Sequence, residues 1–108
     1  MTQSEVANLV AVEIGGDYGR TNHHNLNLRD SLVTPRLVPC RNTFPDPEKP
    51  KPRILKLWVV LEEAPGQEDS YLIVFNDQMN KFGLASNGEN GPVFLGYHGT
   101  FWAAFDGM

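Results

Sequence analysis

The chain has 108 residues, of which 41% are hydrophobic and 20% charged, and its formal net charge is −4. This size and composition are typical of one globular domain and exclude a chain that is disordered throughout. No apolar run approaches the roughly 20 residues that span a bilayer, and the single cysteine excludes an intrachain disulfide.

The first residues hold an acid at position 5 and no early Lys or Arg, so they make a poor signal peptide. The lone cysteine fits a reducing compartment. We therefore expect a bacterial-type cytoplasmic protein without a membrane partner.

Charge is distributed unevenly along the chain. Residues 1–53 carry seven Lys and Arg against six Asp and Glu, whereas residues 54–108 carry two against seven, which are net charges of +1 and −5. We expect the basic stretch 29–53 to pack across the acidic half of the same chain or of a second copy. Nucleic-acid binding is not expected, because an acidic body repels phosphate and the basic stretch lacks interleaved aromatics.

The beginning of the chain, within an N-terminal segment of residues 1–44, favours a helix. Ser4 can cap it, and the residues at helical spacing are Val6, Leu9, Val10 and Glu13. The β-branched residues between 5 and 14 leave a strand as the alternative.

The rest of this segment predicts a loop, a short helix and an extended stretch. Residues 15–27 are rich in Gly, Asn, Asp and His and form the loop, and a short helix follows over 27–33. Pro35 and Pro39 confine the extended stretch to a sheet edge or to no sheet.

Residues 45–53 are a proline-rich connector. Four prolines between positions 45 and 52 exclude a helix or a central strand and favour polyproline II. A PxxP ligand for the aromatic groove of a partner is the alternative to a plain connector.

Residues 54–108 predict an antiparallel meander that ends in a helix. The strand at 54–63 places on one face Leu55, Leu57, Val59 and Leu61. The almost continuously apolar strand at 70–77 is expected to be central and covered on both faces. Thr100 can cap the last helix, which buries Phe101 and Phe105.

The fold class is therefore α+β, with one domain over residues 1–108. We expect a four- to five-stranded antiparallel meander, a C-terminal helix packed on one face and a partly helical N-terminal segment.

No residue is predicted to be catalytic, to bind a metal or to hold a cofactor. His23 and His24 are adjacent and point apart, so they are expected to be solvated loop residues. Arg36 and Arg41 could lower the pKa of Cys40, but no nucleophile motif surrounds it. Glu62 and Glu63 leave opposite faces of a strand end and are expected to be solvated.

The densest cluster of chemically distinctive residues is G-Y-H-G-T-F-W at 96–102. Tyr97, His98 and Trp102, together with Trp58 from an earlier strand, could form an aromatic surface that binds a ligand or a partner. The alternative is an ordinary core with one exposed ring.

The pattern F-G-L-A … V-F-L-G-Y-H-G-T-F-W-A-A-F-D-G-M, with L-W-V-V-L-E-E upstream, covers about the last half of the chain. It resembles small uncharacterised bacterial proteins encoded by orphan reading frames of mobile integron gene cassettes. The resemblance implies a compact α+β protein, often a homodimer, with no assigned activity and no functional residue to carry over.

These observations favour a small non-enzymatic binding protein that forms a homodimer. One alternative is an immunity or antitoxin-like protein whose acidic face binds a basic partner. The other is a small-molecule binder or small enzyme with a cavity between the C-terminal helix and the sheet.

Overall fold

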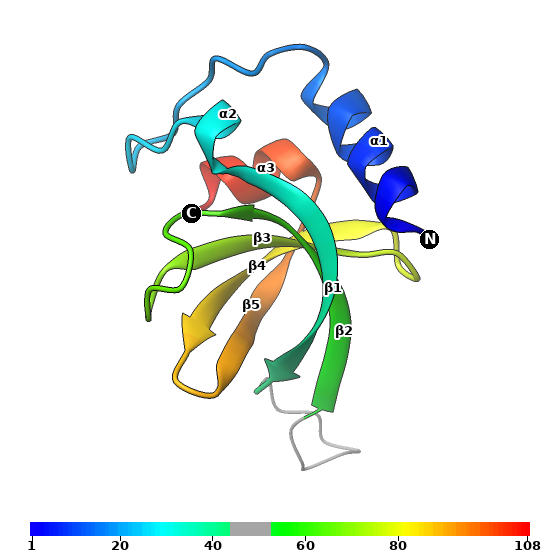
Figure 1. Cartoon of the computed structure of the whole chain (residues 1–108), viewed down its shortest axis with the longest axis vertical. Coiled ribbons are helices and arrows are strands. Elements are labelled where there is room, and N and C mark those ends of the chain that lie inside the picture. The colour runs from blue at the N-terminus through cyan, green and yellow to red at the C-terminus, as the bar shows by residue number, and fades with distance from the viewer. Residues whose placement is uncertain (44–52) are drawn as a thin grey trace.

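The computed structural model describes residues 1–43 and 53–108, and within them the chain forms three helices and five strands (Figure 1). In chain order these are α1 (Gln3–Ile14), α2 (Leu28–Ser31), β1 (Leu32–Asn42), β2 (Arg53–Glu62), β3 (Tyr71–Asn76), β4 (Lys81–Gly88), β5 (Gly91–Gly99) and α3 (Phe101–Asp106). The predicted α+β class is confirmed. The expected proline-rich connector lies outside the described residues, apart from Arg53, which begins β2.

The five strands form one closed barrel in the order β1-β2-β3-β4-β5. Each strand pairs antiparallel with the next, which agrees with the predicted meander. Closure is not predicted by the sequence: β1 also pairs with β5, at Arg41–Val93 and Asn42–Phe94. This closing pair is parallel because the first and last strands of a five-stranded meander run in the same direction.

β1 departs most from its prediction. It pairs with β2 along nearly its whole length, with an irregularity between Leu32 and Arg36. Pairing with β5 begins only after Pro39. A proline has no backbone N–H to donate, so β1 behaves as an edge strand on that side until Pro39 and closes the barrel beyond it. The expectation of a sheet edge or no sheet therefore misses the closure.

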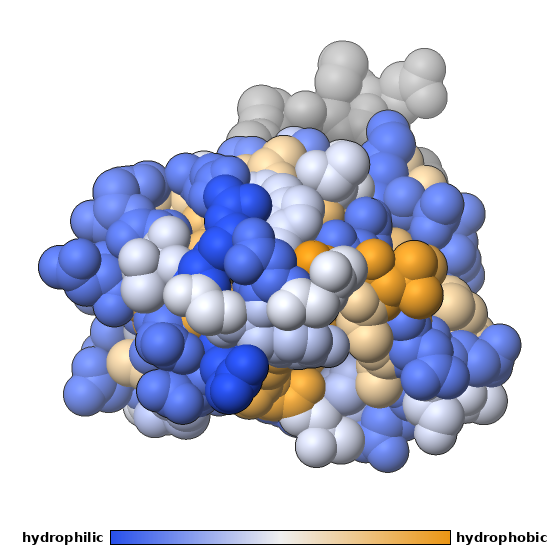
Figure 2. All heavy atoms as spheres, turned by 90° about the horizontal axis from the view of Figure 1, so that it is seen from above, coloured by the Kyte–Doolittle hydropathy of each residue, from blue (hydrophilic) through white to orange (hydrophobic). Residues whose placement is uncertain are grey.

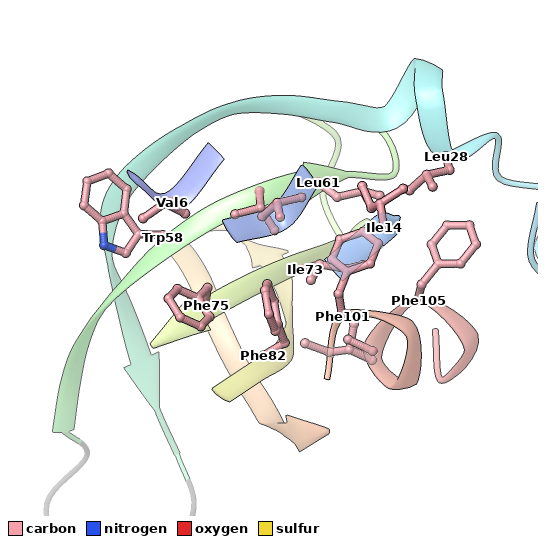
Figure 3. Close-up of a cluster of buried hydrophobic side chains, with 14 of the residues drawn as sticks. Val6, Ile14, Leu28, Trp58, Leu61, Ile73, Phe75, Phe82, Phe101 and Phe105 are labelled. Carbon is pink, nitrogen blue, oxygen red and sulfur yellow. The ribbon is translucent and has the colours of Figure 1, made fainter. Parts of the chain in front are cut away.

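The sheet carries an apolar layer on each face. The barrel interior is filled by Cys40, Leu57, Val59, Leu72, Val74, Ala85 and Phe94. The outer face of β2, β3 and β4 is covered by helices, and Figure 3 shows this second layer, which includes Phe75, Phe82, Phe101 and Phe105. β3 supplies alternate residues to both layers, so its prediction as a central strand covered on both faces is confirmed.

A β-bulge in β2 changes which residues face each layer. The pairing of β2 with β3 shifts by one residue between Val59 and Leu61, and an extra residue reverses the alternation of the side chains beyond it. Leu57 and Val59 point into the barrel, but Leu61 packs in the helix-covered layer. The prediction that Leu61 shares a face with Leu55, Leu57 and Val59 is therefore wrong.

α1 is a helix, as the sequence favoured, and the strand alternative is excluded. Its N-cap is Thr2 rather than Ser4, which lies inside the helix. The Thr2 hydroxyl accepts a hydrogen bond from the Glu5 N–H, and the Glu5 carboxylate accepts one from the Thr2 N–H. The helix ends at Ile14, and its C-cap is Gly15, whose φ of 65° is a left-handed conformation that glycine adopts without strain.

α3 covers the barrel as predicted. The Thr100 hydroxyl accepts a hydrogen bond from the Ala103 N–H at 3.1 Å, which confirms the expected cap. Phe101 and Phe105 are fully buried, and the helix contacts β3, β4, β5 and α1. The Phe101 ring lies edge-on to Phe82, with 5.7 Å between the ring centroids (Figure 3).

Residues 15–27 form the predicted loop, and Asn22 ties it to the end of the chain. Asn22 is buried, and its amide nitrogen donates to the Phe105 carbonyl at 3.0 Å. Its side-chain oxygen accepts from the N–H groups of His24 and Leu26. The following helix, α2, ends at Ser31, two residues before the predicted end.

Candidate functional site

The four candidate binding residues lie in different surroundings. Trp58 is 8% exposed beneath the helices, and its indole N–H donates to Asp77 Oδ2 at 3.2 Å. Tyr97 packs on the barrel-interior layer, 4.7 Å from Phe94 between ring centroids, and its hydroxyl accepts from Asn76 Nδ2 at 2.8 Å. Both residues belong to the packed body of the protein.

His98 and Trp102 lie beside α3. His98 is exposed, and its ring is so close to Gly107 that a Cβ there would lie 2.9 Å from His98 Cε1. Trp102 is half-buried beneath Arg20, whose guanidinium carbon lies 4.1 Å from the ring centroid. Arg20 also donates to both carboxylate oxygens of Asp106. The structure therefore does not join His98 and Trp102 to Trp58 and Tyr97 in one exposed aromatic surface.

Cys40 is not a nucleophile at neutral pH. Its side chain is fully buried in the barrel interior, and burial raises the pKa of the thiol to about 11. The sequence suggested the opposite shift, caused by Arg36 and Arg41. That suggestion is wrong, because Arg36 is engaged by Glu62 and burial dominates at Cys40.

The two loop histidines are exposed, as expected, and one of them, His24, contacts a carboxylate. His24 Nδ1 lies 3.2 Å from Glu63 Oε2, and the His24 ring lies against Tyr71. His23 packs edge-on against His24, with 4.7 Å between the ring centroids. Within residues 1–43 and 53–108, no three His, Cys, Asp or Glu side chains converge on a metal site.

Glu62 is not the solvated strand-end charge that the sequence predicts. Only 6% of it is exposed, and it forms an ion pair with Arg36 of β1. The bulge in β2 places Glu62 opposite Leu72, on the barrel-interior side of the sheet. The pair joins a base from the first half of the chain to an acid from the second, as the uneven charge distribution predicts.

Other acids of the second half are also engaged within the chain. Among the described residues, hydrogen bonds or ion pairs join four carboxylates of residues 54–108 to other groups of the chain: Glu62, Glu63, Asp77 and Asp106. The hydrogen bond from the Trp58 indole lowers the pKa of Asp77. These contacts reduce the acidic surface that a basic partner would meet.

An apolar groove of about 160 Å³ lies between α1 and the β1 side of the barrel. α1 lines it with Ala7, Val10, Ala11 and Ile14, and the other lining residues are Tyr18, Leu32, Val33, Pro35 and Val60. Tyr18 carries the only polar side-chain group among these nine residues. The small-molecule alternative placed a cavity between the C-terminal helix and the sheet, and in that region Phe101 and Phe105 are fully buried.

Beside this groove, α1 presents an uncharged face to solvent. Residues 6–12 contain no charged side chain, and Val12 is 79% exposed. Figure 2 shows apolar atoms gathered on the side of the molecule where α1 lies. We call the exposed residues Ala7, Asn8, Ala11 and Val12 the α1 patch. The run V-A-N-L-V-A-V was the available signal, because it lacks the polar face of an ordinary surface helix.

Comparison of the chain with protein-family models found no match, and comparisons with curated proteins and with solved structures found no significant match. In the described part of the chain, no helix is both long enough and apolar enough to cross a membrane. The groove and the α1 patch are therefore the surface features that bear on function.

Proposed function

We propose that this protein is a non-catalytic binding domain that works as a homodimer, paired through the α1 patch. The observation that carries the proposal is the 79% exposure of Val12 on the helix that lines the apolar groove. Burying a valine side chain contributes about 1.5 kcal/mol. The exposed Val12 is a protrusion, and the side of α1 that carries Ala7 and Ala11 lines a recess. A surface with both features suits a two-fold interface, because in such an interface one surface must fit its own copy.

Helix geometry places Val12 and the two alanines on opposite sides of the exposed face of α1. Successive residues are about 100° apart around a helix. Val12 therefore projects to one side, Ala7 and Ala11 lie towards the other, and Asn8 lies between them. With a two-fold axis running roughly along α1, Val12 of one copy reaches the alanine side of its partner. The small alanine side chains allow the two helices to approach closely.

Electrostatics favour this face for self-association. Two copies of a chain with a net charge of −4 repel each other overall. Residues 6–12 carry no charge, so the α1 patch itself adds no like charges to the interface.

The chemistry of the groove supports binding rather than catalysis. A catalytic site needs an acid, a base or a nucleophile within reach of the substrate, and the groove supplies only the phenol of Tyr18. Its volume of about 160 Å³ is also smaller than a typical small-molecule site. The homodimer is therefore better supported than the small-molecule or enzyme alternative. The homodimer is also better supported than the immunity or antitoxin-like alternative. Four carboxylates are engaged within the chain, which leaves less acidic surface for a basic partner.

Size-exclusion chromatography with light scattering tests the proposal, using Val12→Asp and the control Ile54→Asp. Ile54 is 63% exposed and lies outside the α1 patch, so the control makes a similar change elsewhere. Two buried valines contribute about 3 kcal/mol per dimer, which corresponds to more than about 100-fold in Kd.

We therefore expect the unmodified chain and Ile54→Asp to be dimers at about 100 µM and Val12→Asp to be a 12.1 kDa monomer. A monomeric unmodified chain, or a Val12→Asp variant that dimerises as well as the control, would overturn the proposal.

A further inference from the structure

We infer that a second surface of the barrel binds an extended acidic segment of a partner protein. In Figure 1 the labelled helices lie at the upper end, and the lower halves of β1, β2 and β5 extend away from them. The outward-facing residues there form what we call the outer wall: Pro39, Arg41, Ile54, Lys56, Val93 and Leu95.

The alternation of side chains along the strands shows that the side chains of the outer wall point away from the barrel interior. The sequence neighbours of its residues, among them Cys40 and Phe94, fill the barrel interior, so the wall residues point outward. Arg41 is paired with Ile54 on one side and with Val93 on the other. A cation thus stands between two aliphatic side chains on an exposed surface.

The outer wall is cationic, although the chain as a whole is acidic. β1 and β5 contain no Asp or Glu, and the only acid of β2 is Glu62, which is buried in its ion pair with Arg36. Arg41 and Lys56 are both exposed, and none of the three strands that form the wall supplies a free carboxylate to them. A surface of this charge is complementary to an anionic partner.

The spacing of the two cations matches an extended chain. Arg41 pairs with Ile54, so Lys56 is its diagonal neighbour across the two strands, at a separation of about 7 Å. Side chains two residues apart on one face of an extended segment are also about 7 Å apart. Acids at alternate positions would meet both cations, with Arg41 as a bidentate donor. An aliphatic residue next along that face would meet Leu95, which continues the same diagonal onto β5.

The aliphatic borders favour a peptide over a nucleic acid. The outer wall contains no aromatic residue, so bases would find no ring on which to stack. Ile54 and Leu95 are 63% and 42% exposed and can be covered by apolar side chains.

An NMR titration of the isotope-labelled full chain tests the inference. The probe is an acetylated peptide of about 10 residues in which Glu at two alternate positions is followed by Leu on the same face. We expect its addition to shift the amide signals of residues 39–41, 54–56 and 93–95. A peptide with Gln in place of both Glu should bind at least about tenfold more weakly.

Two variants locate the binding surface. The double variant Arg41→Glu/Lys56→Glu should bind the Glu peptide at least about tenfold more weakly, and circular dichroism checks that it is folded. Val12→Asp, in the α1 patch, should bind as the unmodified chain does. Because the two surfaces are altered separately, failure of this inference and failure of the proposed dimer can be told apart.

The following results would overturn the inference: no shift at about 1 mM peptide, shifts confined to residues outside the outer wall, equal binding of the Gln peptide, or unchanged binding by the double variant. Tighter binding of oligothymidylate than of the Glu peptide would also overturn it, because the wall would then be a nucleic-acid surface.

Discussion

Asn22 shows how a single residue fastens the N-terminal loop to the rest of the molecule. Its buried amide donates to the Phe105 carbonyl and accepts from two loop N–H groups, those of His24 and Leu26. A buried polar group that is fully hydrogen-bonded favours one conformation, because breaking those bonds without water is costly. An asparagine in a polar stretch predicts only a turn, so the sequence does not reveal the contact with α3.

Cys40 makes a contribution to stability that depends on pH. Burial raises the pKa of its thiol from 9.0 for an exposed thiol to about 11 in the folded chain. Between these two pH values the folded state keeps a proton that the unfolded state loses. The free energy of unfolding is unaffected by this group below pH 9.0, and it falls by about 2–3 kcal/mol as the pH rises from 9.0 to about 11. We expect Cys40→Ala to lose that much less stability over this range, measured by urea unfolding. Parallel pH curves for the two chains would contradict the raised pKa.

At the scale of elements, α3 is the helix whose packing is most open to test. Phe105 is fully buried against the barrel and α1, so Phe105→Ala should lower the free energy of unfolding by about 3–5 kcal/mol. Met79 is 49% exposed, and Met79→Ala should change it by no more than about 0.5 kcal/mol. Urea unfolding measures both. Equal effects of the two substitutions would show that α3 does not cover the core.

The elements that were predictable are those whose pattern is local. The apolar run of β3 and the cap and aromatic stripe of α3 are read from neighbouring residues, and both predictions are confirmed. The faces of Leu61 and Glu62 were not predictable, because they depend on a bulge in the pairing of β2 with β3. No glycine or proline marks that bulge in V-V-L-E.

At the scale of the whole molecule, barrel closure rests, among the described residues, on two pairs far apart in the sequence, Arg41–Val93 and Asn42–Phe94. The prolines of β1 correctly indicate an edge but not where the edge ends. The candidate site was missed for a different reason. Reactive and aromatic residues drew the prediction to positions such as Trp58, whose indole N–H has a partner inside the fold. The α1 patch instead consists of small, chemically inert side chains.

The proposed pairing of α1 with its own copy is tested most directly by a disulfide across the interface. On the exposed face of α1, Asn8 lies between Val12 and the alanine side, so a two-fold axis along the helix brings position 8 of both copies together. We expect Asn8→Cys to form, on mild oxidation, a reducible dimer of twice 12.1 kDa. Ile54→Cys should remain a monomer on the same non-reducing gel, and the buried Cys40 should not react. No cross-link in Asn8→Cys, or equal cross-linking of Ile54→Cys, would contradict the account.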